Sequence, residues 1–379
     1  MNRSIEHLPI ETALGNDGEV VIFGAGGSVG TKLYIPKLVG LGLPAHRILA
    51  IEPHDGRRSA LQESYPDINA FSEPEQAFST QNDRPRPVRK VIIASSTAAH
   101  IANLKSITGA IDRGWVRSTD MQVWSEKPMS DPDDFSEVHR LVLEHDLDVS
   151  VGYILRYSRI LPWLHAYMGR NGLTVESIEW KYGKDRTSDS RPSQGVLADE
   201  LVHPLSVTDY ILRADGDYDR PVQVRSAHIQ RRPYVNLQAQ AEARRRNPET
   251  PLRPISDVDT VLGYHIAGLV LPVTVSSSFL FPEEVRKAVI STCDRSDNKW
   301  QLSVDFDVRE FDDEGCERRV DILRGPDNSE LHRWSGDKAM LQMIHFLGLL
   351  TTHDAVPPRT SFVGECALQQ VLADIAKKE

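Results

Sequence analysis

Residues 20–30 read VVIFGAGGSVG, and this stretch decides the fold. The apolar run Val20 to Phe23 ends directly at Gly24, which is typical of a strand buried inside a parallel sheet. A helix-like stretch follows over residues 31–41. Glycines between such a strand and helix let the backbone turn sharply and approach a pyrophosphate, whose charge the helix N-terminus stabilises. The stretch therefore predicts a dinucleotide-binding turn.

The predicted turn contains an imperfect G-x-G-x-x-G pattern, because Val29 takes the third-glycine position and Gly30 follows it. Glu52 ends the next apolar run, where a carboxylate accepts hydrogen bonds from an adenosine ribose. A carboxylate repels a 2′-phosphate, so Glu52 favours NAD, whereas Arg57 and Arg58 would admit NADP. The expected cofactor contacts in this region are Gly24, Gly26, Gly27, Ser28, Val29 and Glu52.

Two other interpretations of the same turn are weaker. Residues 26–30 also spell the G-x-S-x-G nucleophile elbow of hydrolases, but that fold needs several strands before the serine and only one precedes it here. A P-loop is excluded because Lys32 does not directly follow a glycine of the required spacing.

The rest of the chain predicts two domains. Further apolar runs alternate with helical segments such as 98–113, which indicates a doubly wound parallel sheet over residues 1–155; these runs are 47–51, 90–94, 121–125 and 149–153. Residues 156–379 are β-rich, with a helix at 197–212 and a terminal helix at 361–376 that we expect to pack near the first domain. Their strands predict an open-faced, mainly antiparallel sheet with helices on one face; they are 175–182, 221–230, 260–279, 286–294, 299–306 and a hairpin over 310–323.

Composition narrows the function classes. The 379 residues hold 44 Lys and Arg against 54 Asp and Glu, a net charge of −10 that argues against nucleic-acid binding. Three widely spaced cysteines provide no zinc pair or disulfide framework. The leader 1–19 lacks the apolar core of a signal peptide, and no apolar stretch is long enough to span a membrane. We therefore expect a cytoplasmic protein without membrane or nucleic-acid partners.

Two short motifs contain the candidate catalytic residues. Glu126-Lys127-Pro128 follows the fourth strand, at the sheet edge where doubly wound proteins bind ligands, and its X-Pro bond can be cis. Asp199 and His203 are four residues apart and would share one helix face. Alone, Glu126-Lys127-Pro128 is equally compatible with a surface turn, and Asp199-x-x-x-His203 with an ordinary structural helix. No further ligand stands at metal-binding spacing, so we expect no metal.

The order of these motifs resembles the Gfo/Idh/MocA oxidoreductase family, which includes glucose–fructose oxidoreductase and inositol dehydrogenase. The resemblance runs from about residue 18 to the terminal helix and rests on Gly24-x-Gly26, Glu52, Glu126-Lys127-Pro128, Arg156-Tyr157 and Asp199-x-x-x-His203. It implies a nicotinamide-binding Rossmann domain, substrate bound between the domains, and a homodimer or homotetramer formed through the open sheet. It also implies that Lys127 touches cofactor and substrate, that Glu126 and Pro128 line the cofactor, and that Asp199 and His203 form a proton-transfer pair.

Two departures from the family pattern concern the substrate more than the cofactor. Ser95, Ser96, Thr97 and His100 stand in the place of the cofactor-lining T-P-x-x-x-H stretch, with Ser96 replacing the proline. After His203 the sequence continues Pro-Leu-Ser, without the aspartate that relatives often carry.

The expected activity is hydride transfer between NAD(P) and a secondary alcohol or ketone of a sugar, cyclitol or similar molecule, with Lys127 and His203 as proton-transfer groups. Imine or enone reduction and redox-assisted lyase or glycosidase chemistry are alternatives on the same scaffold. A non-catalytic NAD(P) sensor is the alternative of another class. The expected substrate contacts are Lys127, Tyr153, Arg156, Tyr157, Asp199 and His203.

The arginine-rich segment 231–256 fits none of these motifs. It is either a solvated insertion between strands or an arm that reaches a substrate anion or another subunit.

Overall fold

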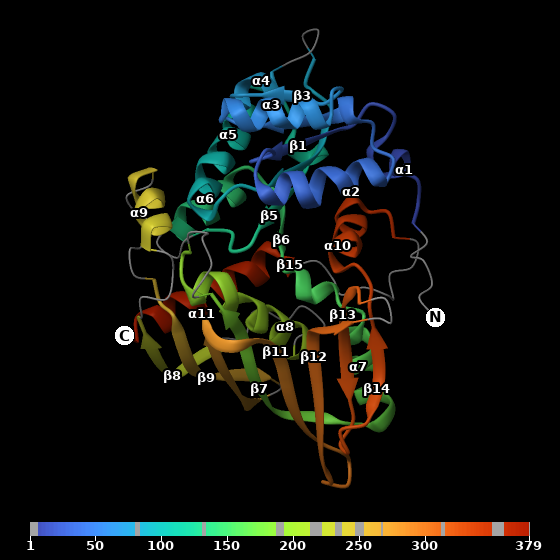
Figure 1. The fold of residues 1–379 in the computed structure, drawn as a ribbon, viewed down its shortest axis with the longest axis vertical. Helices are drawn as coiled ribbons and strands as arrows, with labels where there is room; N and C mark the ends of the chain where they lie inside the picture. Colours follow the sequence, from blue (N-terminus) through green and yellow to red (C-terminus); the bar gives the residue numbers. More distant parts are fainter. Residues whose placement is uncertain are drawn as a thin grey trace.

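The computed structural model contains two sheets stacked along the long axis of the molecule (Figure 1). It describes residues 7–79, 84–130, 134–186, 193–212, 222–231, 237–246, 254–266, 268–311, 315–350 and 360–378. Within these ranges, no helix is both long and apolar enough to cross a membrane.

The first sheet is the predicted Rossmann sheet, in the order β15-β6-β5-β4-β1-β2-β3. All its pairs are parallel except β15 with β6. Its strands are β1 Glu19–Phe23, β2 Ile48–Ile51, β3 Asn69–Phe71, β4 Val88–Ile93, β5 Gln122–Glu126, β6 Asp148–Gly152 and β15 Thr360–Ser361. Because β1 lies between β2 and β4, the glycine turn that follows it opens where the strand order reverses.

Short helices connect these strands. They are α1 Ile10–Leu14, η1 Gly30–Tyr34, α2 Ile35–Gly40, η2 Ala45–Arg47, α3 Asp55–Ser64, α4 Pro74–Phe78, η3 Thr97–Ala99, α5 His100–Asp112, η4 Ser118–Asp120 and α6 Phe135–Glu144. The predicted helix over 31–41 is thus a π-helical turn that continues into α2. Strands β1 and β2 are buried along their whole length, which explains why they are apolar except for Glu19 at the start of β1, whose carboxylate pairs with Arg86.

The second sheet has the order β14-β13-β12-β11-β7-β10-β9-β8. It is antiparallel apart from the pair β10 and β7, as the fold prediction requires. Its strands are β7 Thr174–Asp185, β8 Val222–Gln230, β9 Asp257–Ile266, β10 Leu269–Ser278, β11 Leu280–Cys293, β12 Lys299–Phe311, β13 Glu317–Arg324 and β14 Glu330–Trp334. The stretch predicted as one β segment over 260–279 is a hairpin of two strands, and the tip of the predicted 310–323 hairpin lies outside the described residues.

Helices cover one face of this sheet. In β7, Ile178, Trp180 and Tyr182 are buried whereas Glu179 and Lys181 between them are exposed, so one face is packed and the other open. The Trp180 indole donates a hydrogen bond of 2.8 Å to Thr208 on the helix side. The helices after residue 153 are η6 Ile154–Tyr157, α7 Ile160–Asn171, η7 Leu197–Leu201, α8 Val202–Leu212, α9 Leu237–Arg246, α10 Lys338–Leu347 and α11 Phe362–Ala376.

The end of the chain returns to the first sheet. Strand β15 extends that sheet beside β6, and α10 packs against α1 and α2. Lys37 of α2 forms an ion pair with Asp337, which caps α10. The predicted boundary at residue 155 falls inside η6, but segments after residue 336 belong to both halves of the molecule.

Candidate functional site

The glycine turn after β1 lets a ligand approach the backbone closely. Gly24 has a φ of +69°, and a Cβ there would lie 2.8 Å from Cα of Ser95. A Cβ on Gly26 would lie 2.8 Å from both Cγ of Glu52 and Cβ of Arg57. Both positions therefore require glycine, and Ser28 and Val29 at the tip are exposed. Such a cradle fits the pyrophosphate of a dinucleotide.

Glu52 lies beside this turn and forms the floor of the glycine cradle. Its side chain accepts hydrogen bonds of 3.1 Å from the backbone N–H groups of Gly26 and His54. Arg58 donates to the Glu52 carbonyl at 3.0 Å and pairs with Asp55. Arg57 is exposed, and its guanidinium makes no hydrogen bond or ion pair within the described residues. Of the two arginines, Arg57 is thus the one available to a ligand.

His100 lies behind the predicted cofactor-lining stretch rather than on its surface. The ring is 1% exposed, with Nε2 3.1 Å from the Ser95 carbonyl and Nδ1 3.1 Å from the Met129 carbonyl. Burial lowers the pKa of His100, opposed by these backbone contacts. His100 therefore joins the loop after β4 to the loop after β5. Ser95 and Thr97 are half-buried in that first loop, and Ser96 is exposed.

Glu126 ends β5 beside the glycine helix. Its carboxylate accepts a hydrogen bond from the hydroxyl of Tyr34, which in turn accepts one of 3.0 Å from the Trp124 indole. Burial raises the pKa of Glu126, opposed by the Tyr34 hydrogen bond and the charge of Lys127. The Lys127–Pro128 bond that follows is cis.

Lys127 reaches from the first sheet to the helix of the second domain. Its Nζ donates to the backbone carbonyl of Asp199 at 2.6 Å, with the Ala198 carbonyl at 3.5 Å. Burial lowers the pKa of Lys127, although Asp199, Glu200 and Glu126 act to raise it. The amine is thus easier to deprotonate than an exposed lysine.

His203 lies in the same neighbourhood and is 8% exposed. The ring centroid is 5.7 Å from that of Tyr182 and 6.5 Å from that of Tyr153. Burial lowers the pKa of His203 well below its usual value, and the nearby positive charges of Lys127, Arg286 and Lys184 lower it further. Nδ1 has no hydrogen-bond partner in the described part of the chain. The imidazole is therefore neutral at neutral pH.

Asp199 does not orient His203 as the i,i+4 spacing suggests. Its carboxylate accepts hydrogen bonds from Arg186 at 2.6 Å and from Ser193 at 2.5 Å, and none joins it to His203 within the described residues. Residues 197–201 form a π-helical turn ahead of α8, and within it the Asp199 carboxylate is held by Arg186 and Ser193. Arg186 was not predicted; its one sequence signal is a charge directly after a long strand.

The three predicted substrate contacts after β6 are all buried. Tyr153 borders His203, and its hydroxyl donates to Glu365 of α11 at 2.6 Å. Arg156 is 3% exposed and lies under the Tyr210 ring at 5.8 Å, whereas Tyr157 packs against Trp124 and His345. Of the three, Tyr153 is the one with a ring contact to His203. Glu365 was missed because it lies far along the sequence.

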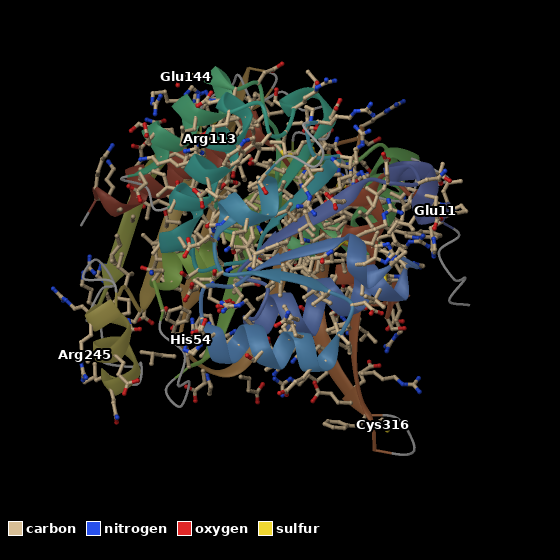
Figure 2. All side chains as sticks on the ribbon, turned by 90° about the horizontal axis from the view of Figure 1, so that it is seen from above. Glu11, His54, Arg113, Glu144, Arg245 and Cys316 are labelled. Atoms are coloured by element: carbon tan, nitrogen blue, oxygen red, sulfur yellow. The ribbon has the colours of Figure 1, made fainter. Side chains whose placement is uncertain are left out.

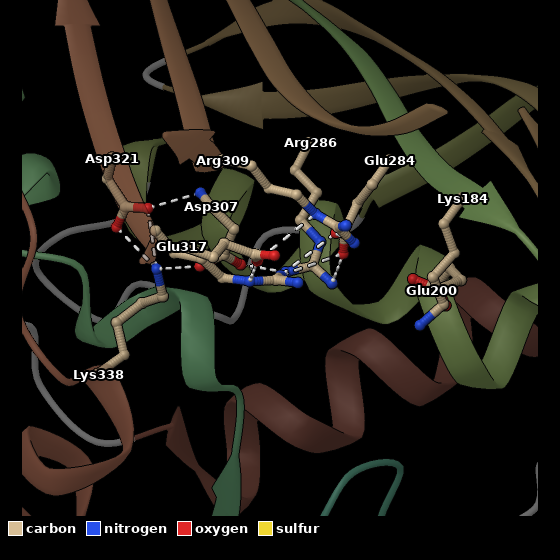
Figure 3. A network of polar contacts seen from close by, with 10 residues as sticks. Lys184, Glu200, Glu284, Arg286, Asp307, Arg309, Glu317, Asp321 and Lys338 are labelled. Atoms are coloured by element: carbon tan, nitrogen blue, oxygen red, sulfur yellow. Dashed lines mark hydrogen bonds and ion pairs between the residues drawn. The ribbon is translucent and has the colours of Figure 1, made fainter. Parts of the chain in front are cut away.

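A charged pocket of about 740 Å³ adjoins this site. Arg286 connects the two, because its guanidinium lies 5.8 Å from the Tyr182 ring that packs on His203. Figure 3 shows its ion pairs with Glu284 and Asp307, and those of Lys338 with Asp307 and Asp321. Five cations and five carboxylates line the pocket; they are Lys184, Arg286, Lys287, Arg309 and Arg319, and Asp185, Glu283, Glu284, Asp305 and Asp307.

Comparison with known proteins rests on structure. No protein-family model matches the chain, and no curated protein matches its sequence. Solved structures do match. The KijD10 3-ketoreductase of Actinomadura kijaniata in complex with NADP and TDP-benzene has a TM-score of 0.64 at 10% identity, covering 96% of this chain and 98% of its own.

Two further neighbours show the breadth of this fold. The UDP-N-acetylglucosamine 3-dehydrogenase GnnA of Acidithiobacillus ferrooxidans has a TM-score of 0.58 at 14% identity, with 95% of both chains covered. The transcriptional regulator Gal80p of Kluyveromyces lactis has a TM-score of 0.65 at 11% identity, covering 95% of this chain and 91% of its own. The structural neighbours include oxidoreductases of the Gfo/Idh/MocA type, and the chain has their two-domain fold.

Proposed function

We propose that the protein is a member of the Gfo/Idh/MocA family and an NAD(P)-dependent oxidoreductase, transferring hydride between the nicotinamide and a secondary alcohol or ketone of a polyhydroxylated molecule. The observation that carries this proposal is the contact between the half-buried Lys127 amine, which follows β5 of the first sheet, and the helix that carries the buried His203 imidazole. The solved ketoreductase and dehydrogenase neighbours support it.

The residues that would hold the cofactor follow from the sheet order. Strands β2, β1, β4 and β5 are adjacent and parallel. The residues at their carboxyl ends therefore lie in one row; they are Glu52, the Gly26 turn, Ser95 and Glu126. The turn would receive the pyrophosphate and Glu52 the adenosine ribose. When bound, the nicotinamide supplies or accepts the hydride.

Lys127 is the proton-transfer group in this proposal. In ketone reduction its ammonium donates a proton to the oxygen that becomes negatively charged, and in alcohol oxidation its neutral amine removes the hydroxyl proton. His203, held neutral by burial and surrounding cations, accepts or donates a hydrogen bond that orients the same oxygen. Asp199 serves through its backbone carbonyl, which holds the Lys127 amine.

The neighbouring pocket favours a neutral, hydroxyl-rich substrate. Its cations and carboxylates are equal in number, and Arg286, Arg309 and Arg319 already pair with Glu284. A phosphate would have to displace these carboxylates, whereas sugar hydroxyls can bond to both kinds of group. An absorbance assay at ~340 nm against free and nucleotide-linked sugars, cyclitols and their keto forms tests this. Turnover of the neutral compounds supports the proposal, and turnover confined to the nucleotide-linked sugars contradicts it.

The pH dependence of the reaction rate should report the protonation state of Lys127. Because its pKa lies below the ordinary lysine value, ketone reduction should be constant at low pH and fall as pH rises through this lowered pKa. Alcohol oxidation should rise through the same value. Profiles of kcat/KM in both directions measure this. An alkaline limb that persists after Lys127→Arg substitution would assign the titration to another group.

Cofactor preference should depend on Glu52 and Arg57. We propose NAD as the favoured cofactor, with NADP admitted through Arg57, which lies beside Gly26 with its guanidinium exposed. A charged hydrogen bond contributes about 1.5–3 kcal/mol, so Arg57→Ala should weaken NADPH binding by roughly tenfold or more and leave NADH binding unchanged. Fluorescence titrations of both nucleotides measure this. Equal loss for both would contradict the assignment.

A regulatory role is the second candidate, favoured by the likeness to Gal80p. A regulator binds dinucleotide without consuming it, so nucleotide binding without turnover across the whole panel would favour it. The half-buried Lys127 amine near His203 argues for chemistry instead, since a sensor has no use for such a group.

A further inference from the structure

The arginine-rich segment is anchored to the loop beside the proposed site. Helix α9 carries Gln240, whose side chain is 0% exposed. Its amide nitrogen donates to the Ser193 carbonyl at 2.9 Å, and its amide oxygen accepts from the Ser193 N–H at 2.7 Å. Among the other described side chains of the helix, those of Glu242, Arg244 and Arg245 are exposed, and α9 lies at the periphery of the molecule, where Figure 2 labels Arg245.

The anchored residue holds the Asp199 carboxylate. The Ser193 hydroxyl donates to Oδ2 of Asp199 at 2.5 Å and accepts from the Gly195 N–H at 3.0 Å and from Arg186 at 3.4 Å. A hydroxyl has one donor and two acceptor positions, so all three are used. The place of the Ser193 backbone therefore sets where this hydroxyl, and with it Asp199, can lie.

Asp199 completes the connection to Lys127. Its backbone carbonyl accepts the Lys127 amine at 2.6 Å, and its carboxylate is fixed on the other side by Arg186. Contacts thus run without interruption from α9 through Ser193 and Asp199 to the amine.

We propose that Gln240 is a positioning residue, by which the inserted helix α9 fixes Ser193 and Asp199 and so holds the Lys127 amine in place for proton transfer. This rests on the proposed function only for the role given to Lys127. The segment is then part of the active-site structure, and its exposed arginines are the solvated side of a helix whose buried side is Gln240.

The direction in which the pKa of Lys127 should change follows from the charges around it. Glu126, Asp199 and Glu200 are the carboxylates that raise its pKa, Lys184 lowers it, and the neutral His203 adds no charge at working pH. If Asp199 moves away, a stabilising negative charge and a carbonyl acceptor are lost together. The pKa of Lys127 should then fall further.

Competitive acetylation of Lys127, followed by mass spectrometry across a pH series, measures this without any substrate. Acetic anhydride reacts with the free amine, so the midpoint of labelling reports the protonation of Lys127. In Gln240→Ala the midpoint should move to lower pH, and kcat should fall about tenfold with little change in KM. The matched control is Glu242→Gln on the exposed side of α9, which should match the wild type in both measurements.

Ser193→Ala provides the second variant, because it keeps both backbone bonds to Gln240 and removes the hydroxyl, with its contacts to Asp199, Gly195 and Arg186. It should shift the labelling midpoint in the same direction. A purely structural role would lower the melting temperature of Gln240→Ala and leave the midpoint unchanged, which would overturn the proposal. If the wild type shows no turnover, the proposed function fails, while the labelling shift still decides the role of Gln240.

Discussion

Replacing Lys127 with methionine should lower turnover by about 10²–10⁴-fold, the usual contribution of a positioned proton-transfer group. Methionine has a similar length and is apolar, so it fills the space near the Asp199 carbonyl but cannot donate or accept the proton. The glycine turn is untouched, and NAD(P)H should bind as in the wild type. Steady-state rates and a nucleotide titration on the same preparation measure the two effects.

Lys105→Met is the matched control, because this lysine side chain is 55% exposed on α5 and pairs with Glu137 of α6. It should retain wild-type rates. If Lys127→Met turns over at the wild-type rate, the amine has no part in the chemistry and the proposed mechanism is wrong.

The second large effect is expected at the glycine turn. Alanine at Gly26 places a Cβ 2.8 Å from Cγ of Glu52 and from Cβ of Arg57, distances that side chains do not tolerate. The floor of the cradle must move, so the affinity for NAD(P)H should fall about 10- to 100-fold, or roughly 1.4–2.7 kcal/mol. Fluorescence titration of the nucleotide measures the loss.

Gly40→Ala is the control for this substitution. A Cβ on Gly40 meets nothing within 4 Å, so this variant should bind nucleotide normally and keep its melting temperature. Equal affinity of Gly26→Ala and the wild type would show that the dinucleotide does not lie in this turn.

The fold could be predicted from sequence because its central strands are buried on both faces. Strands β1, β2, β4 and β5 read as apolar runs for this reason. The two strands of the first sheet that were missed lack that signal. β3 has three residues, all at least partly exposed, and β15 has two residues that pair with β6 from the far end of the chain.

The candidate site could be predicted only in part. Lys127 is close to the Asp199–His203 helix, although 72 positions separate it from Asp199, and this proximity was implied by the family resemblance of the two motifs. The orientation of Asp199 could not be predicted, because Arg186 and Ser193, which hold its carboxylate, lie 13 and 6 positions earlier and only the fold brings them to it. Gln240 carries no sequence signal, as its partner Ser193 lies 47 positions earlier and only the fold brings the two together.

His100 shows a different limit of prediction from sequence. Its place after Ser95 is compatible with contact to a cofactor, and the sequence does not reveal that both ring nitrogens face backbone carbonyls. Burial is set by packing against the loop after β5, a contact between strands that are neighbours in the sheet but distant in sequence. His100 therefore supports the Lys127 loop from behind.

Deuterium transfer tests the central claim most directly. Wild-type protein and Lys127→Met are incubated in turn with NAD or NADP and a panel of sugars and cyclitols that carry deuterium on their alcohol carbons, and the nucleotide is examined by mass spectrometry. The account predicts that deuterium appears on the nicotinamide ring with the wild-type protein and not with the variant. A wild-type protein that binds the nucleotide and transfers no deuterium from any compound would contradict it.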